Sequence, residues 1–140
     1  MAEPASGWAL DHMGVAVADL DAALAQWGQL GLRPTHVEDV TADGIRVAFL
    51  PWAGGELELM APTEPEGAVA RFLAKRGPGL HHVAFRVGHL AETLAQLAEA
   101  GVRLVDAVPR PGSRGTLVAF LHPKSLGGVL TELVEASDGE

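Results

Sequence analysis

The sequence predicts an α+β protein built from two similar modules. Residues 79–87, Gly-Leu-His-His-Val-Ala-Phe-Arg-Val, are a second copy of residues 10–17, Leu-Asp-His-Met-Gly-Val-Ala-Val. Residues 47–51 return as residues 118–122, and residues 54–59 return as residues 127–133. The offset between the copies grows from 70 residues at the histidines (82 minus 12) to 74 at the glutamates (132 minus 58). The second copy therefore has longer loops, and we expect a functional site where equivalent positions of the two copies converge.

The first module reads as strand, helix and three strands. Residues 9–17 alternate in polarity and are rich in Val and Ala, which predicts a strand with His12, Gly14 and Ala16 on one face. The larger apolar side chains lie on the other face, where a helix can cover them. Asp19 is a suitable N-cap for a helix over residues 20–30, and Gly31 suits its end. Strands follow at about residues 33–40, 44–51 and 56–61.

The second module repeats this order after a linker. A short helix is predicted over residues 66–75, followed by the second copy of the first strand at residues 79–87. A helix over residues 90–100 and strands at 102–107, 115–122 and 128–135 complete the module. Residues 1–8 read as a loose tail, and both ends of the chain as disordered. We therefore predict one domain made of two modules, about residues 8–62 and 79–136.

Composition excludes several classes of protein. A formal net charge of −8 argues against a nucleic-acid binder, which needs a basic face. No apolar run approaches the roughly 20 residues that span a bilayer, so we expect no membrane partner and a cytoplasmic location. The chain has no cysteine, so any metal must be held by nitrogen and oxygen ligands.

The repeated positions include one histidine and one carboxylate in each module. His12 and Glu58 belong to the first module, and His82 and Glu132 to the second. Glu56 lies on the same strand face as Glu58, but the repeat register favours Glu58. An ionised Glu132 in an apolar strand needs a partner. Two imidazoles and two carboxylates suit one divalent ion, such as Co, Mn, Ni, Zn or Fe, although a structural role for each histidine stays open.

These residues carry a family resemblance that covers about residues 9–136. The chain resembles the vicinal oxygen chelate (glyoxalase/bleomycin resistance/dioxygenase) superfamily and, within it, the methylmalonyl-CoA epimerases. The segments that carry the resemblance are residues 10–17, 47–51, 57–59, 71–77, 79–85 and 120–133. The most specific is the last, with His-Pro-Lys followed by Gly-Gly-Val-Leu and a Glu.

The resemblance implies both a fold and a reaction. The fold would be two tandem βαβββ modules that form an open, barrel-like, U-shaped cleft. One divalent metal ion would be held by His12, Glu58, His82 and Glu132. The reaction would be epimerisation of methylmalonyl-CoA, or a close 2-carboxyacyl-CoA, through a metal-stabilised enolate. A homodimer is the expected assembly.

The sequence departs from the family pattern at two positions. The resemblance gives Glu132 an acid–base role, and it implies a second acid–base Glu two residues before the Gly that opens the third strand. That position is Ala42 here, so the adjacent Asp43 becomes the candidate second group. Arg86, where relatives often have an acidic residue, is expected in an ion pair at the rim of the site.

Two other functions share the same pattern. A glyoxalase I-type isomerase acting on a glutathione hemithioacetal would use the same metal with a different thiol carrier. A small-molecule-binding module of the resistance type would use the fold without metal, and it would be expected to lose the His/Glu set. Since that set is complete, the sequence favours the metal enzyme.

Overall fold

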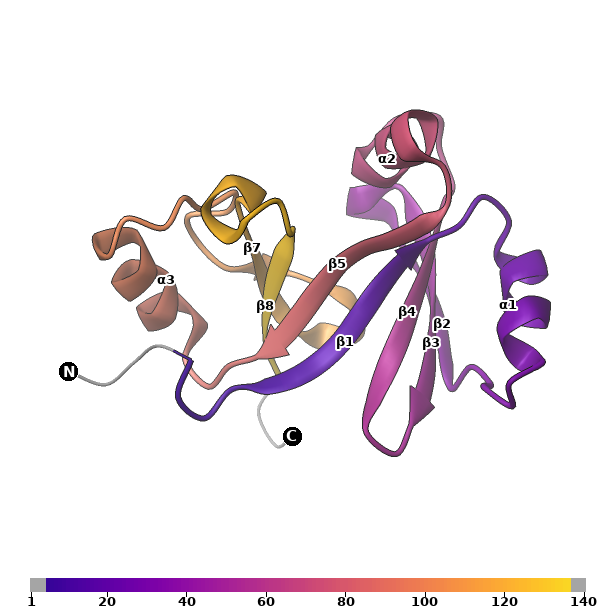
Figure 1. Cartoon of the computed structure of the whole chain (residues 1–140), viewed down its shortest axis with the longest axis horizontal. Coiled ribbons are helices and arrows are strands. Elements are labelled where there is room, and N and C mark those ends of the chain that lie inside the picture. Colours follow the sequence, from indigo (N-terminus) through magenta and orange to yellow (C-terminus); the bar gives the residue numbers. More distant parts are fainter. Residues whose placement is uncertain (1–4, 137–140) are drawn as a thin grey trace. The chain divides into compact units, whose positions relative to one another are not determined.

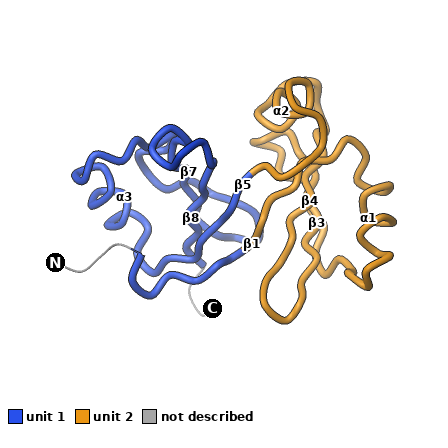
Figure 2. Tube along the Cα trace, viewed as in Figure 1, with its two compact units in different colours: residues 1–11, 82–140 blue, residues 12–81 orange. Residues whose placement is uncertain are grey.

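A computed structural model describes residues 5–136 and divides the chain into two compact units, which are described separately below (Figures 1 and 2). Unit 2 comprises residues 12–81, and unit 1 comprises residues 1–11 together with 82–140. Each predicted module therefore contributes the start of its first strand to the other unit. Of the tail predicted over residues 1–8, residues 1–4 lie outside the described part. Trp8 is not loose, because its ring is half-buried 5.8 Å from that of Phe85.

Unit 2 is a four-stranded sheet with a helix on each face. Its strands are β1 (Ala9–Ala16, whose first residues belong to unit 1), β2 (His36–Val40), β3 (Ile45–Trp52) and β4 (Gly55–Pro62), in the spatial order β2-β3-β4-β1. β1 is parallel to β4, whereas β3 is antiparallel to both of its neighbours. Helix α1 (Leu20–Gly28) contacts β3 and β4, and helix α2 (Ala68–Arg76) contacts β4 (Figure 1).

The alternation of side chains decides which helix covers which face of unit 2. Met13, Val15 and Val17 pack with Trp27 and other residues of α1, as the strand pattern predicts. Ala16 faces the other way, into a cluster with Val47, Phe49, Met60 and the apolar face of α2. Because side chains alternate along a strand, His12 shares the α2 face with Ala16. The sheet therefore presents His12 away from α1.

Unit 1 repeats the strand arrangement, with one α-helix packed on one face of its sheet. Its strands are β5 (Gly79–Arg86, whose first residues belong to unit 2), β6 (Arg110–Pro111), β7 (Leu117–Leu121) and β8 (Thr131–Glu135), in the order β5-β8-β7-β6. Phe85 and Val87 pack with the buried face of α3 (Leu90–Glu99). Ala84 lies on the opposite face of the sheet with Val118 and Val134. His82 shares this second face, so it occupies the same place in unit 1 as His12 in unit 2.

Most element boundaries agree with the sequence to within two or three residues, and the predicted N-cap is confirmed. The side chain of Asp19 accepts a hydrogen bond of 3.1 Å from the Ala22 N–H, and Gly31 beyond α1 has φ of 88°. The connections between elements include the short 3₁₀ helices η1 (Thr41–Asp43), η2 (Ser113–Gly115) and η3 (Pro123–Leu126).

The strand predicted over residues 102–107 is wrong. This stretch forms only an isolated bridge between Leu104 and Leu121, and the paired strand is the two-residue β6. Backbone hydrogen bonds still join Val105 and Asp106 to the Phe120 carbonyl, while the Asp106 carboxylate accepts a hydrogen bond of 2.9 Å from the Phe120 N–H. The Phe120 N–H thus donates to a side-chain oxygen, whereas in a regular ladder it would donate to a backbone carbonyl of the neighbouring strand.

The fold class predicted from the sequence, α+β with two strand–helix–strand modules, is confirmed. Within the described residues, no helix has the length and apolar character needed to cross a membrane.

Candidate metal and active site

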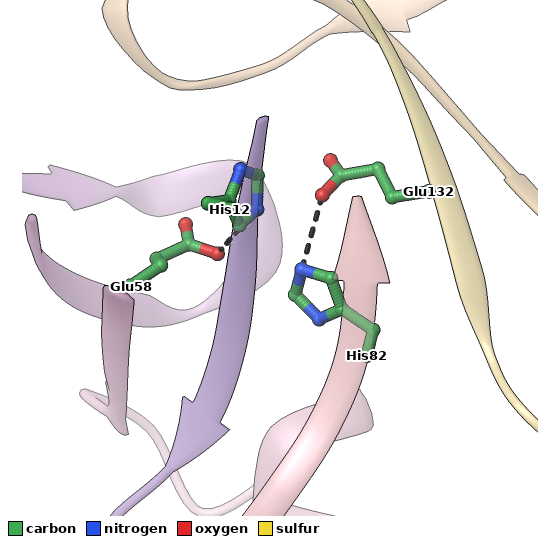
Figure 3. A group of neighbouring side chains, drawn as sticks. All are labelled: His12, Glu58, His82 and Glu132. Atoms are coloured by element: carbon green, nitrogen blue, oxygen red, sulfur yellow. Dashed lines mark ion pairs between the residues drawn. The ribbon is translucent and has the colours of Figure 1, made fainter. Parts of the chain in front are cut away.

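Each unit holds one buried histidine–glutamate pair (Figure 3). In unit 2, Nε2 of His12 lies 3.2 Å from Oε1 of Glu58. In unit 1, Nε2 of His82 lies 3.0 Å from Oε1 of Glu132. All four side chains are at most 10% exposed. An ionised carboxylate is costly to bury without a partner, and each of these two glutamates has a histidine beside it.

The same three-strand arrangement builds both pairs. Glu58 lies opposite Phe49 on the antiparallel neighbour and beside Gly14 on the parallel neighbour. His12 is two residues before Gly14, so it emerges on the same face of the sheet as Glu58. The ring of His12 stands edge-on to Phe49, with 5.9 Å between ring centroids and 89° between planes.

Unit 1 reproduces this geometry. Glu132 lies opposite Phe120 and beside Ala84, two residues after His82. The ring of His82 stands edge-on to Phe120, at 5.4 Å and 85°. An edge-on aromatic neighbour restricts the rotation of the imidazole, which fixes the direction of Nε2.

The two phenylalanines are supporting residues that the sequence analysis did not assign to the site. A signal was present, since Phe49 and Phe120 stand at equivalent positions of the repeat, in Val-Ala-Phe-Leu. Their role depends on strand register, which brings each phenylalanine opposite its glutamate.

The donor set of these pairs suits a divalent metal ion. Each of His12, Glu58, His82 and Glu132 is buried and offers one ligand atom, an imidazole nitrogen or a carboxylate oxygen. Mixed nitrogen and oxygen donors without thiolate are typical of sites for Mn, Fe, Co, Ni or Zn. In each pair the imidazole nitrogen already faces the carboxylate oxygen, so both donors point toward a common position. The residues therefore fit such an ion.

The other candidates are placed differently. Asp43 lies half-buried at the end of η1 in unit 2, and the neighbouring Ala42 is exposed. Arg86 forms the expected ion pair, with Asp11 as its partner. Nε and Nη2 of Arg86 donate to Oδ1 of Asp11 at 3.1 and 2.9 Å. Asp11 is buried, whereas the Arg86 side chain is 60% exposed.

Three of the other four histidines have structural partners. The His81 ring packs edge-on against Phe72, with 4.9 Å between ring centroids. His36 lies 2.6 Å from Glu38 on the edge strand β2. Nδ1 of His122 accepts a hydrogen bond of 3.0 Å from the Lys124 N–H at the start of η3. Partial burial, with the charges of Arg103 and Lys124, holds the pKa of His122 below its usual value.

Comparisons with known proteins agree on one family. Residues 11–120 match the Glyoxalase/Bleomycin resistance protein/Dioxygenase superfamily model. The chain is 41% identical to the uncharacterized protein YqjC of Bacillus subtilis over 127 residues, covering 90% of this chain and 91% of that protein. It is 35% identical to the ethylmalonyl-CoA/methylmalonyl-CoA epimerase of Cereibacter sphaeroides, covering 89% and 95% of the two chains.

A solved structure extends this likeness to the fold. The crystal structure of methylmalonyl-CoA epimerase from Mycobacterium tuberculosis superposes with a TM-score of 0.87 at 43% identity. The match covers 92% of this chain and 88% of that chain. With this fold, these pairs and these relatives, the chain is an isomerase of the methylmalonyl-CoA epimerase-like group and belongs to the glyoxalase/bleomycin resistance protein/dioxygenase superfamily.

Proposed function

We propose that this protein epimerises methylmalonyl-CoA, or a closely similar 2-carboxyacyl-CoA, and that the reaction depends on a divalent metal ion. The observation that carries the proposal is the pair of buried His–Glu contacts at equivalent positions of a repeat. The ethylmalonyl-CoA/methylmalonyl-CoA epimerase of Cereibacter sphaeroides supports the choice of substrate. The carbon to be inverted in such a substrate lies between a thioester and a carboxylate, both rich in oxygen.

We propose that His12, Glu58, His82 and Glu132 together hold the ion. A bound divalent ion would supply Lewis acidity toward the substrate's thioester and carboxylate oxygens. The two histidines would provide neutral nitrogen ligands. The phenylalanine beside each ring would keep its Nε2 directed at the ion, so that little reorganisation is needed when the ion binds.

Inversion requires one group to remove the α-proton and another to return a proton to the opposite face. We assign proton transfer on one face of the α-carbon to Glu132. A carboxylate that would bind a metal through one oxygen keeps the other oxygen for proton transfer. Asp43 is our candidate for the other face. The electron pair left by the proton moves into the adjacent carbonyl groups and returns to carbon when the second proton arrives.

The proposal is tested by following the α-proton of methylmalonyl-CoA in deuterated water by NMR. Metal-stripped protein should show no exchange, and addition of Co or Mn should start both exchange and loss of stereochemical purity. Asp43→Ala should abolish inversion while Glu132 still exchanges the proton of one epimer. His36→Gln is the matched control, since His36 belongs to a half-exposed His–Glu pair outside the proposed ligand set.

Three outcomes contradict parts of the proposal. If the metal-loaded protein catalyses no exchange, the epimerase assignment is wrong and a glutathione hemithioacetal is the next substrate to test. If exchange proceeds equally without metal, the metal requirement is wrong. Should Asp43→Ala invert the substrate normally, Asp43 is not the second acid–base group.

We also propose a homodimer located in the cytoplasm. Sedimentation equilibrium tests the assembly, and a single species with the chain mass of 14.6 kDa would contradict it.

A further inference from the structure

The cations of this acidic protein are unevenly distributed along the chain. Residues 67–91 contain Arg71, Lys75, Arg76 and Arg86 and not one Asp or Glu, although the chain as a whole has 18 acidic residues against 10 basic ones. Three of these four cations lie on helix α2 of unit 2. We refer to Arg71, Lys75 and Arg76 as the α2 basic cluster.

Helix stability alone does not account for this cluster. Lys75 and Arg76 lie in the last turn, where a positive charge favours the helix dipole. Arg71 lies outside that turn and precedes Lys75 by four residues, so the two like charges face each other on the helix surface and oppose helix formation. All three residues are exposed, and among the described residues none forms an ion pair with them.

The packing of α2 places the cluster on the functional side of unit 2. Val69, Phe72 and Leu73 bind the helix to the sheet face that carries Ala16 and Phe49. This is also the face from which His12 and Glu58 emerge. Ala16 is four residues after His12 on β1, which corresponds to about 13 Å along a strand. The helix therefore lies on the same face as the His12–Glu58 pair, and Phe49 belongs both to its apolar cluster and to the contacts of the His12 ring.

One member of the cluster is held in place by aromatic contacts. The Arg76 guanidinium lies over the Phe72 ring, 5.7 Å from its centroid. Phe72 in turn packs edge-on against His81, at the start of β5. A guanidinium that rests on a fixed ring loses less freedom when it binds an anion, and its planar fork matches the oxygens of a phosphate.

We propose that the α2 basic cluster binds the phosphate groups of the nucleotide end of an acyl-CoA substrate. This inference rests on the proposed function, because an acyl-CoA presents a thioester at one end of a long pantetheine arm and several phosphate charges at the other. An acidic protein repels such a polyanion over most of its surface, so a local group of unpaired cations is needed to attract it. Charge-assisted hydrogen bonds from Arg and Lys to phosphate provide that attraction.

The test compares two substrates that differ only in the nucleotide end. The double variant Arg71→Gln/Lys75→Gln and the single variant Arg76→Gln are assayed with methylmalonyl-CoA and with the methylmalonyl thioester of pantetheine. For the double variant we expect KM for the CoA substrate to rise about tenfold to a hundredfold, with kcat nearly unchanged. The pantetheine thioester, which lacks the phosphates, should be turned over as well by the variants as by the original protein.

A matched control removes two positive charges elsewhere in unit 2. Arg46 lies on the other face of β3, in an ion pair with Asp39, and Arg33 donates to the Gly28 carbonyl at the end of α1. Arg33→Gln/Arg46→Gln therefore changes the net charge by the same amount, and it should leave KM for both substrates unchanged. An equal rise in KM for this control would show that only the overall charge matters, which overturns the proposal.

A binding measurement separates this inference from the proposed reaction. Calorimetry with metal-free protein gives the Kd of CoA and of 3′-dephospho-CoA without any catalytic step. Weaker CoA binding in the double variant supports the phosphate site even if no epimerase activity is found. Equal CoA binding by the original protein and the double variant, or an equal loss of activity on both thioesters, overturns it while leaving the proposed function intact.

Discussion

Replacing Glu132 by Gln separates a metal ligand from a structural ion pair, because the two roles predict opposite results. Glu132 is buried, and its carboxylate lies 3.0 Å from Nε2 of His82. Gln has nearly the same shape and can still hydrogen-bond to the imidazole, but it carries no charge. Exchanging a buried ion pair for a neutral pair of similar volume is often close to neutral for stability. We therefore expect the metal-free variant to stay within about 1 kcal/mol of the original protein.

The metal-loaded proteins should behave differently. An ion present at 100 times its Kd stabilises the native state by about 2.7 kcal/mol. If the substitution weakens binding a hundredfold, the same ion concentration contributes only about 0.4 kcal/mol. For a chain of this size each kcal/mol corresponds to a few degrees in Tm, so the metal-dependent rise should fall from about 10 °C to about 1–2 °C.

The assay is thermal unfolding at pH 8, with chelator and with Co or Mn, followed by circular dichroism. Glu38→Gln is the control, because Glu38 also contacts a histidine, His36, but on a half-exposed edge strand. This control should keep the full metal-dependent rise. If Glu132→Gln retains that rise, Glu132 is not a ligand. If the metal-free variant is destabilised by about 3 kcal/mol or more, His82 and Glu132 form a structural ion pair of the kind whose breakage is costly, and the assignment of Glu132 as a metal ligand is refuted.

Two further predictions concern residues outside the proposed ligand set. Arg86→Gln should lower the free energy of unfolding by about 1–3 kcal/mol, because it removes two hydrogen bonds from the buried carboxylate of Asp11. Urea denaturation measures this free energy, and an unchanged urea midpoint would contradict the prediction. The pKa of His122 is lower in the folded protein than in the unfolded chain. Above the unfolded pKa of about 6.5, His122 therefore has no effect on the free energy of unfolding. As pH falls below that value, the unfolded chain binds the proton more readily, so the folded state loses stability. His122→Asn keeps an acceptor for the Lys124 N–H but cannot titrate, so its Tm should fall less between pH 7.5 and 5.5; an identical pH dependence would show that His122 does not contribute.

Much of the fold could be read from the sequence because the two modules repeat. The alternation around His12 and His82 correctly assigned one face of each first strand to helix packing, as the contacts of Val15 and Phe85 confirm. The Asp19 cap and the turn at Gly31 follow local rules that need no tertiary context. Local rules failed at residues 102–107, where the apolar pattern resembles a strand but Asp106 takes the hydrogen bond of Phe120.

What the sequence determined by itself was the kind of chemistry: two histidines and two carboxylates at equivalent positions, no thiol, and an acidic chain without a spanning segment. Residue type and spacing are enough for that, because ligand preference is a property of the side chain. Only the tertiary structure decided that His12 meets Glu58 and His82 meets Glu132, that a phenylalanine stands against each imidazole, and that Asp11 is the partner of Arg86, 75 residues away. These contacts depend on strand register and on the pairing of distant strands, and a register shift of one residue would turn every one of these side chains to the opposite face.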